Sequence, residues 1–508
     1  MKNFHSHPLL RGALILTCTG VVGRLIGFFY RIFLSGLIGA EGLGIYQLIF
    51  PVYALCISLC TAGIQIAISR FTASNTAVGN QKGALESLQT GMTCSLLFSL
   101  VCFLFLRLFA HPIALFILQE SRCEELLKIV SFAIPFAAIH SCISGYYLGL
   151  KQTGIPAISQ FLEQIVRVVA TWLLWQICTE KGIVFTPAFI TASIVIEEVI
   201  SCLFCILALL LKTGSSHLLS FRSFFSFRRH GREILTLSAP ITLNHVILNL
   251  LQSVEALCIP GRLRLHGLTS SESLSVYGVL SGMTLPLLLF PSAITMSLSS
   301  MLLPAISEAQ ASGNQKRISE TIQKTVSGCL VLGIFCTGLF FFFGKDLGML
   351  LFKSNLCGSF LLTLSFVCPF LYLSGTLASI LNGLGKTSSV FWGNLTALSV
   401  RIAFLFFLIP IFGIRGFLWG FLVSQLLLVF LHFRSLKKEA DFELDAFCLF
   451  LKPAAAVLIS YGICCALHAL FSGLPEILRL IGKIGVYGIF YLFFLILWRV
   501  FPLSSKPS

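Results

Sequence analysis

The sequence predicts an all-α polytopic membrane protein with about fourteen transmembrane helices. Of the 508 residues, 56% are hydrophobic and only 11% are charged, and a soluble domain of this length could not bury so much apolar surface. Apolar runs long enough to cross a hydrocarbon core of roughly 30 Å recur along the whole chain. No connection between them exceeds about 20 residues, so the connections leave no room for an extramembrane catalytic domain.

The individual spans follow from the apolar runs and the charged, Gly- or Pro-containing breaks between them. They are predicted near 12–38, 45–72, 88–110, 126–149, 154–177, 184–211, 233–257, 273–304, 318–343, 358–383, 388–411, 414–434, 446–470 and 476–499. Pro51, Pro286 and Pro291 interrupt spans 2 and 8. Such breaks are tolerated where helices bend around a cavity or must flex.

The distribution of Lys and Arg predicts that both termini are cytoplasmic. With the N-terminus inside, 20 Lys and Arg residues fall on the cytoplasmic side, 11 fall on the other side and four are buried in spans. Cytoplasmic loops carry such an excess of basic residues. Arg262 and Arg264 oppose the assignment. The net charge of +15 is therefore interpreted as a topology signal, and no nucleic-acid partner is predicted.

An internal repeat with a constant offset of 234 residues divides the chain. The matches are Gly79-Asn80-Gln81-Lys82 with Gly313-Asn314-Gln315-Lys316, Pro135-Phe136 with Pro369-Phe370, Gly149-Leu150 with Gly383-Leu384, and Arg167 with Arg401. We predict two parallel six-helix lobes, residues 1–220 and 221–438, and an appended helix pair at 439–508. Parallel repeats of this kind place a substrate site between them near the bilayer midplane.

Two arginines mark the first span. Arg24 and Arg31 are seven residues apart and share a helix face with small residues such as Gly20 and Gly27. An arginine at mid-membrane costs at least about 2.5–3.5 kcal/mol, so it requires water, a partner or an anionic ligand. The pattern favours a hydrated cavity that receives a negatively charged group. The alternative is that both side chains snorkel or neutralise buried carboxylates.

A polar stripe marks span 7, the repeat equivalent of span 1. Its members follow 3–4 spacing and share one helix face: Thr242, His245, Asn249, Gln252 and Glu255. A hydrogen-bonding seam between helices would produce the same stripe. We favour a cavity position for these residues because they lie on the equivalent of the arginine helix.

Other embedded polar residues have two interpretations each. Gln65 in span 2 fits a packing role as well as a ligand role. Glu163 and Arg167 are i,i+4 in span 5 and can form an ion pair with each other. Arg401 has no such partner, because Ala397 occupies the position equivalent to Glu163. Arg167 and Arg401 remain candidates for the cavity.

Glu197 and Glu198 lie near the middle of span 6. Together with Glu163 they are candidates for carrying a coupling proton or ion, although they could equally bond to a neighbouring helix. Cys202 and Cys205 form a CxxC inside this span without a second pair, so they are interpreted as buried hydrophobes. No Walker motif, HExxH or GxSxG is present. We therefore predict a protein that is not an enzyme and has no metal site or cofactor.

The block GRLIGFFYRIFLSGLIGAEGLGIYQLIFPVYALCISLCTAGIQIAISR at 23–70, the GLKQTG and GLGKTS loops and the 6+6+2 layout resemble the stage V sporulation protein B group. This group belongs to the polysaccharide-transport branch of the multidrug/oligosaccharidyl-lipid/polysaccharide exporter superfamily. The resemblance implies two six-helix lobes that work by alternating access, and a role in spore cortex peptidoglycan synthesis. In the related lipid II flippases, first-helix arginines face the cavity, and Arg24 and Arg31 match them. Arg70 is a weaker match to another basic position, and span 8 has no basic residue where those flippases have one.

The resulting hypothesis is a flippase for an undecaprenyl-diphosphate-linked saccharide, with lipid II foremost, in the bacterial cytoplasmic membrane. Arginine forks grip phosphate oxygens bidentately, which suits Arg24 and Arg31 to a diphosphate. The protein is expected to be monomeric and to meet cell-wall synthesis proteins. Coupling to a H⁺ or Na⁺ gradient or to the membrane potential is left open. The alternatives are a cation-coupled multidrug exporter of the same superfamily and a flippase for O-antigen or exopolysaccharide repeat units.

Overall fold

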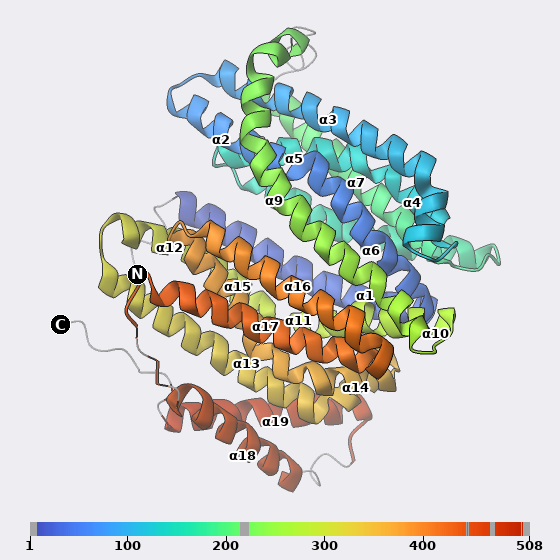
Figure 1. The fold of residues 1–508 in the computed structure, drawn as a ribbon, viewed down its shortest axis with the longest axis vertical. Helices are drawn as coiled ribbons and strands as arrows, with labels where there is room; N and C mark the ends of the chain where they lie inside the picture. Colours follow the sequence, from blue (N-terminus) through green and yellow to red (C-terminus); the bar gives the residue numbers. More distant parts are fainter. Residues whose placement is uncertain are drawn as a thin grey trace. The chain divides into compact units, whose positions relative to one another are not determined.

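A computed structural model describes residues 8–213, 223–442, 444–445, 447–467, 473–498 and 500, with side chains described from Thr17 to Lys212 and from Gly231 onward. In these ranges the secondary structure is helical and contains no strand. The chain divides into two compact units, Met1–Gly278 and Val279–Ser508. Figure 1 follows the chain through both units in the colours of the sequence. The predicted all-α architecture is confirmed.

The first unit contains eleven described elements. They are α1 (Pro8–Ile57), η1 (Ser58–Ala62), α2 (Gly63–Ala77), α3 (Gln81–Pro112), η2 (Ile113–Ile117), α4 (Cys123–Ser131), α5 (Ala133–Gly149), α6 (Gly154–Glu180), α7 (Pro187–Thr213), α9 (Ser223–Leu265) and α10 (Ser270–Gly278). Within this unit α6 packs against α7, α5 packs against α2, α3 and α7, and α1 packs against α6, α9 and α10.

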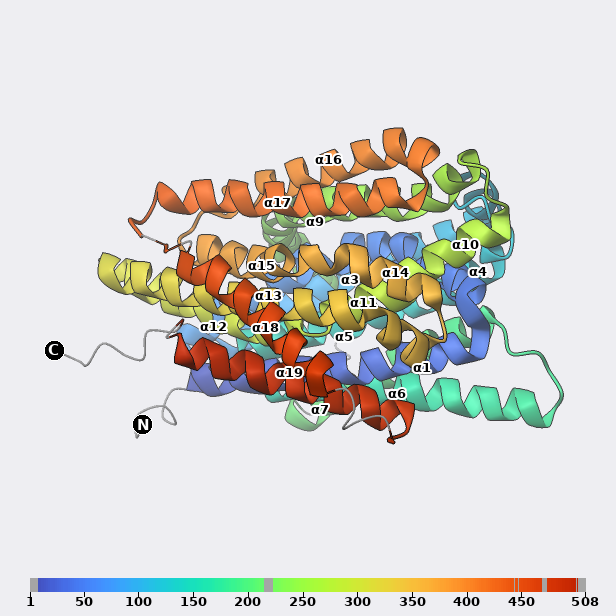
Figure 2. The ribbon, with the colours of Figure 1, turned by 90° about the horizontal axis from the view of Figure 1, so that it is seen from below.

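The second unit contains the remaining described elements. They are η3 (Val279–Thr284), α11 (Leu285–Leu289), α12 (Ser292–Ala311), α13 (Gln315–Phe352), α14 (Asn355–Leu364), η4 (Ser365–Val367), α15 (Cys368–Gly383), α16 (Thr387–Phe412), α17 (Ile414–Lys437), η5 (Phe447–Leu451), α18 (Lys452–Ala466) and α19 (Glu476–Leu497). Helices α16 and α17 lie side by side, as do α18 and α19 (Figures 1 and 2).

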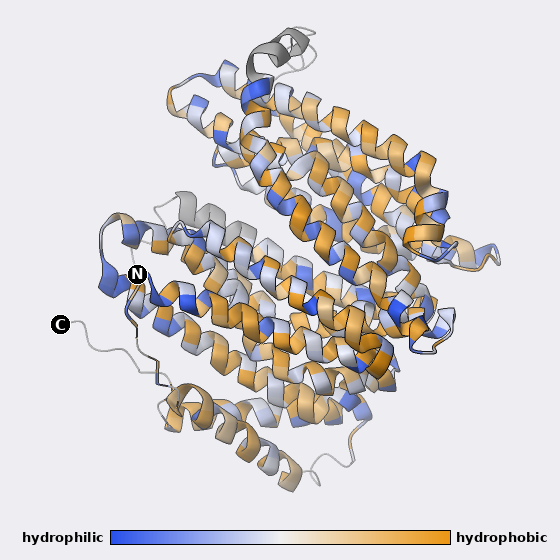
Figure 3. Cartoon of the chain, viewed as in Figure 1, coloured by the Kyte–Doolittle hydropathy of each residue, from blue (hydrophilic) through white to orange (hydrophobic). Residues whose placement is uncertain are grey.

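Twelve of the described helices are long and apolar enough to cross a membrane, and a bent pair formed by α4 and α5 makes a thirteenth. One of the twelve, Thr17–Ala77, has 61 residues and would be roughly 90 Å long as one straight helix. It contains the non-helical Gly39, with φ 66° and ψ −175°, in the break expected between spans 1 and 2. Division at Gly39 gives the fourteen predicted spans. Figure 3 shows the long apolar stretches of the helices, with hydrophilic residues concentrated near helix ends and connections.

Predicted span 8 is not one continuous helix. The chain forms α10, the π-helical turn η3, the short α11 and then α12, with the break between the last two at Phe290 and Pro291. Proline removes a backbone donor and clashes with the preceding turn. Pro51, by contrast, is accommodated within α1, where its carbonyl accepts a hydrogen bond from the Ser253 hydroxyl at 3.0 Å.

The 234-residue repeat is confirmed by local geometry in each unit. Asn80 and Asn314 are N-cap residues of α3 and α13 with φ −84° in both cases, and each side chain accepts a hydrogen bond from the backbone N–H three residues later. The preceding Gly79 and Gly313 have φ of 74° and 67°, a region that suits glycine because it has no Cβ. Two separate sequence segments therefore fold into the same turn and cap.

The compact units do not coincide with the predicted lobe boundaries. The first unit extends to Gly278 and so takes in α9 and α10, whereas the sequence repeat begins its second copy near residue 221. The compact units are defined by which helices pack together, whereas the repeat is defined by matching residues in the sequence. The lobe assignment 1–220, 221–438 and 439–508 therefore stays a prediction.

Candidate functional site

The arginine face of α1 lies beside α6. A Cβ placed on Gly23 would lie 3.4 Å from Cγ of Gln164, and one on Gly27 would lie 3.7 Å from its Oε1. Arg24 is exposed and forms no hydrogen bond or ion pair with another residue that the structure describes. An exposed guanidinium at this depth of an apolar helix is suited to water or an anionic ligand.

Arg31 is half-buried, one heptad further along the same helix. Its guanidinium interacts electrostatically with Tyr46 and Tyr30 of α1 and with Arg167 of α6. A guanidinium at membrane depth raises the local positive potential. Such a potential favours an anionic ligand.

Arg167 is held by a bidentate ion pair with Glu197. The Nε and Nη2 atoms of Arg167 donate to the two carboxylate oxygens of Glu197, whose side chain is 2% exposed. This corrects the sequence-based pairing of Arg167 with Glu163. An i,i+4 spacing permits an ion pair, but α7 supplies a carboxylate that meets both guanidinium donors, and this fork geometry is stronger than a single contact.

A chain of hydroxyls continues from this ion pair to α1. Thr171, one turn after Arg167, is hydrogen-bonded to Ser193 at 2.9 Å and to the Tyr30 hydroxyl at 2.9 Å. Tyr30 is the residue next to Arg31, and all three of these hydroxyl-bearing residues are buried. The hydroxyl chain therefore fixes α6 and α7 against the arginine-bearing part of α1.

Glu163 and Glu198 meet at a histidine that the sequence analysis did not single out. His140 of α5 places Nε2 3.0 Å from Oε2 of Glu198 and Nδ1 3.6 Å from Oε1 of Glu163. The Tyr53 hydroxyl donates to the other oxygen of Glu198 at 3.0 Å. The sequence feature that could have identified His140 is its position as an ionisable residue in the middle of a largely apolar span. Such a residue is a functional-site hypothesis by default.

The remaining embedded candidates lie in different surroundings. Gln65 packs against α5, because a Cβ on Gly145 would lie 2.7 Å from its carbonyl oxygen. Arg70 is exposed near the end of α2. Arg401 of α16, in the second unit, lies over the Phe421 ring at 4.9 Å, a cation–π arrangement. These positions support packing for Gln65 and assign no ligand to any of the three residues.

Only some residues of the polar stripe of α9 pack against a neighbouring helix. A Cβ on Gly63 of α2 would lie 2.3 Å from Thr242 Oγ1, so that end of the stripe is a tight helix crossing. His245 and Gln252 are exposed, Asn249 is half-buried and Glu255 is 9% exposed. Whether the exposed members line a cavity stays a prediction.

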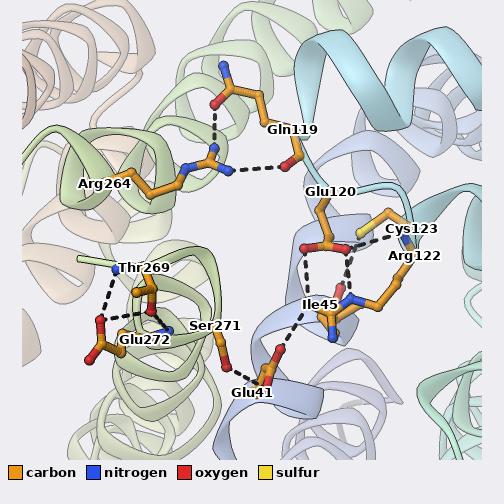
Figure 4. A network of polar contacts seen from close by, with 10 residues as sticks. All are labelled: Glu41, Ile45, Gln119, Glu120, Arg122, Cys123, Arg264, Thr269, Ser271 and Glu272. Carbon is orange, nitrogen blue, oxygen red and sulfur yellow. Dashed lines mark hydrogen bonds and ion pairs between the residues drawn. The ribbon is translucent and has the colours of Figure 1, made fainter. Parts of the chain in front are cut away.

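A second polar network lies near the connections at one end of the first unit (Figure 4). Arg122 binds Glu120 through Nε at 2.7 Å and Glu41 through Nη2 at 2.8 Å, and the Ser271 hydroxyl donates to Glu41 at 2.7 Å. Arg264 donates to the backbone oxygen of Gln119 at 3.2 Å and also to its side-chain oxygen. These contacts join α9 and α10 to α1 and to the connection between η2 and α4.

In this network Glu120 and Arg122 stabilise each other's charged form. Burial raises the pKa of the Glu120 carboxyl, but hydrogen bonds from the side chain and backbone of Arg122 outweigh burial and leave that pKa below its ordinary value. The hydrogen bond with Glu120 raises the pKa of Arg122. No motif in the sequence pointed to this network.

In the described part of the chain, no group of three or more His, Cys, Asp or Glu side chains is arranged to hold a metal ion. The site is thus built from arginines, carboxylates, one histidine and hydroxyls. Such groups bind anions and transfer protons.

Comparison with known proteins places the chain among membrane transporters. It is 26% identical to stage V sporulation protein B of Bacillus subtilis (strain 168) over 507 residues, 97% of this chain and 95% of that protein. It is 25% identical to the lipid II flippase MurJ of the same organism over 349 residues, 64% and 63% of the two chains. The resemblance to the stage V sporulation protein B group is confirmed.

Solved structures show the same fold. A structure of the lipid II flippase MurJ in an inward closed conformation aligns with a TM-score of 0.73 at 16% identity, covering 95% of this chain and 98% of that chain. An inward-facing multidrug resistance MATE family transporter of the MOP superfamily aligns with a TM-score of 0.64, also at 16% identity, covering 84% and 98%. The model of the family described as polysaccharide biosynthesis protein matches residues 9–310, more than half of the chain. The chain therefore belongs to the polysaccharide biosynthesis protein family.

Proposed function

We propose that this multi-pass membrane protein is a flippase that moves an undecaprenyl-diphosphate-linked saccharide across the bacterial cytoplasmic membrane by alternating access. Lipid II for peptidoglycan is the foremost substrate, and the relative named for sporulation supports use in the spore cortex. The protein acts as a transporter, with no enzymatic step. The observation that carries the proposal is the pair of arginines on one face of α1, at membrane depth, next to a third arginine on α6.

The chemistry of this face fits a diphosphate. Arg24 is exposed, and Arg31 lies in the electrostatic reach of Arg167. The charge of Arg167 is compensated by Glu197, and the proposal assigns the phosphates to Arg24 and Arg31 because these two arginines share one face of α1. Charge-assisted, bidentate hydrogen bonds are the strongest that arginine forms, and they are stronger in a low-dielectric cavity than at a surface.

The same proposal specifies the path of the substrate and the orientation of the protein in the membrane. The saccharide would cross through hydrated space while the prenyl tail stays in lipid. Both termini would be cytoplasmic because the positive-inside count favours that orientation. The protein would act as a monomer and deliver its substrate to cell-wall synthesis proteins.

The test uses purified protein in liposomes and a fluorescent undecaprenyl-diphosphate saccharide. Arg31→Ala removes one charge-assisted interaction and should weaken binding by about 1.5–3 kcal/mol, roughly a tenfold to hundredfold loss of affinity. Arg31→Lys keeps the charge but loses the fork, so its defect should be intermediate. Arg415→Ala is the matched control, because Arg415 is exposed at the start of α17 in the second unit.

Binding and flipping by a folded Arg24→Ala, Arg31→Ala double variant at the wild-type level would overturn the diphosphate site. If the variants are missing from the membrane and are rescued by changing a carboxylate, the two arginines are structural. Transport of cationic drugs without binding of the lipid would instead assign the protein as a multidrug exporter.

A further inference from the structure

The cluster around His140 contains more negative charge than permanent positive charge. In the ion pairs of the described residues, three carboxylates, those of Glu163, Glu197 and Glu198, share it with one guanidinium, that of Arg167. All four side chains are embedded in helices of apolar composition. Because an uncompensated charge at such a depth is costly, the cluster must take up protons or another cation.

The excess negative charge lies in the part of the cluster formed by His140, Glu163 and Glu198. Glu197 is satisfied by both donors of the Arg167 fork, which leaves Glu163 and Glu198 facing one imidazole. The His140 side chain is 15% exposed, and those of Glu163 and Glu198 are 20% and 13% exposed. A neutral imidazole carries one ring N–H, so His140 can take up one further proton on its other ring nitrogen and become imidazolium, and another proton can reside on a carboxylate oxygen. These groups are therefore arranged as a site that gains and loses protons.

The other charges and polar groups near His140 come from three of the helices that pack against α5. Helix α6 contributes Glu163 and Arg167, α7 contributes Glu197 and Glu198, and α1 contributes the Tyr53 phenol. In the described chain, α2, α3, α4 and η1 pack near α5 but place no ion pair or hydrogen bond on His140. No lysine or second arginine neutralises the two remaining carboxylates from these described elements.

The second repeat lacks this arrangement. At the 234-residue offset, His140, Glu163 and Glu198 correspond to Ser374, Ala397 and His432. His432 is 1% exposed, and in the described chain neither ring nitrogen has a hydrogen-bond partner. Arg167 alone keeps its type, as Arg401. The carboxylates are a feature of the first repeat, so packing common to both repeats does not account for them.

We propose that His140, Glu163 and Glu198 form a proton-binding site in the first repeat and that its protonation is coupled to the substrate arginines. The connection is short. Glu198 follows Glu197 on α7, Glu197 holds Arg167, and Arg167 acts electrostatically on Arg31. A proton gained at the site lowers the negative charge beside Glu197 and Arg167. The electrostatic potential at Arg31 therefore becomes more positive. The coupling to the substrate arginines rests on the proposed function, whereas the proton-binding site itself does not.

The first experiment measures protons directly on the substrate-free protein in nanodiscs. Histidine-labelled protein is titrated by NMR from mildly acidic to mildly alkaline pH, and proton uptake is measured in parallel. The wild type should take up roughly one proton more than His140→Gln. Glu198→Gln and Glu163→Gln should each displace the titration of the His140 signal. His266→Gln is the control, since His266 is exposed in the connection between α9 and α10.

A His140 signal that titrates identically in the wild type, Glu163→Gln and Glu198→Gln would overturn the proton site. The isosteric Gln variants keep the side-chain volume, and they are compared only where their NMR spectra show the wild-type fold. If one variant fails to fold, the other carries the same test.

The second experiment imposes a pH gradient or a Na⁺ gradient on liposomes that contain the protein and the lipid-linked saccharide. A pH gradient should accelerate flipping in the wild type but not in Glu198→Gln, which should keep substrate binding within about twofold. Acceleration by Na⁺ alone would overturn the assignment to protons. An intact His140 titration in a protein that moves no lipid-linked saccharide would contradict the flippase proposal and leave the proton site standing.

Discussion

Gly44 and Gly278 pack reciprocally, each against the backbone four residues before the other. A Cβ on Gly44 would lie 2.1 Å from the carbonyl oxygen of Leu274, and a Cβ on Gly278 would lie 2.0 Å from that of Ala40. Gly278 and Leu274 are the repeat equivalents of Gly44 and Ala40, since both pairs differ by 234 residues. A contact in which residue i meets j and j meets i is the mark of a two-fold relationship. The crossing of α1 and α10 is therefore locally two-fold symmetric.

The first prediction is that alanine at this crossing destabilises it. Backbone atoms cannot rotate away from an added methyl group, so Gly44→Ala and Gly278→Ala should each cost about 1–3 kcal/mol as overpacked substitutions. Gly36→Ala in α1 is the control, because a Cβ there meets nothing within 4 Å and the change favours the helix. Thermal unfolding in detergent measures the difference. Equal stability of the Gly44, Gly278 and Gly36 variants would contradict the close crossing.

The second prediction concerns the ion pair between Glu120 and Arg122. Glu120 is 7% exposed and Arg122 is 51% exposed, so loss of the arginine leaves a buried carboxylate without its charged donor. Arg122→Ala should lower the free energy of unfolding by about 1–3 kcal/mol at neutral pH. The added Glu120→Gln change should recover part of that loss, because it removes the unpaired charge. Additive effects in this double-mutant cycle would show that the two side chains do not interact.

The effect of Arg122→Ala should depend on pH. The pKa of Glu120 is lower in the folded protein than its ordinary value, so its contribution is present above the unfolded-state pKa and is lost as pH falls through the folded-state pKa. The difference in stability between wild type and Arg122→Ala should therefore shrink below about pH 4. A difference that grows on acidification would contradict the pair.

The third prediction concerns the two equivalent N-caps. Asn80 accepts from the Gly83 N–H at 2.9 Å and Asn314 accepts from the Arg317 N–H at 3.0 Å. Asn80→Ala and Asn314→Ala should each cost about 0.5–2 kcal/mol, and their similar geometry predicts similar costs. Hydrogen exchange of the first turns of α3 and α13 reports each cap separately. Protection unchanged in both variants would exclude a stabilising role for the caps.

Much of the fold could be predicted because the bilayer imposes a length and an apolar composition on each span. The repeat was visible because its turns need particular residues, such as Gly79 and Gly313 at positive φ. Span 8 was predicted as one apolar span interrupted at Pro286 and Pro291, and the helix does break at Pro291. Hydropathy alone would not have located this break, because it stays high across Pro291. Hydropathy reports burial in lipid and is insensitive to the direction of the backbone.

The site was predicted less completely. Each embedded charge could be recognised by its cost, but its partner depends on which helices meet. Glu163 and Arg167 are adjacent on one helix face. In the folded protein, however, Arg167 forms its ion pair with Glu197, and Glu163 lies beside His140. The crossing at Gly44 and Gly278 was likewise invisible, since a close approach of two helices is a property of the folded pair.

The last prediction concerns how α18 and α19 dock on α13. The Tyr487 hydroxyl donates to the Phe335 carbonyl at 3.0 Å, and the Tyr491 hydroxyl donates to the Val331 carbonyl at 2.8 Å. Both tyrosines are at most 2% exposed. A Cβ on Gly338 would lie 2.2 Å from the Tyr487 hydroxyl oxygen, so the helices are in close contact there.

Tyr487→Phe and Tyr491→Phe each delete one hydrogen bond without removing the ring and should each cost about 0.5–1.5 kcal/mol. Gly338→Ala should cost more, about 1–3 kcal/mol, because the methyl group displaces the Tyr487 ring. Gly462→Ala in α18 is the control, since a Cβ there meets nothing within 4 Å. The measurement is protease sensitivity of the connection between α17 and α18 together with thermal unfolding. If Gly338→Ala leaves both as in the control, α18 and α19 do not dock on α13 through this face.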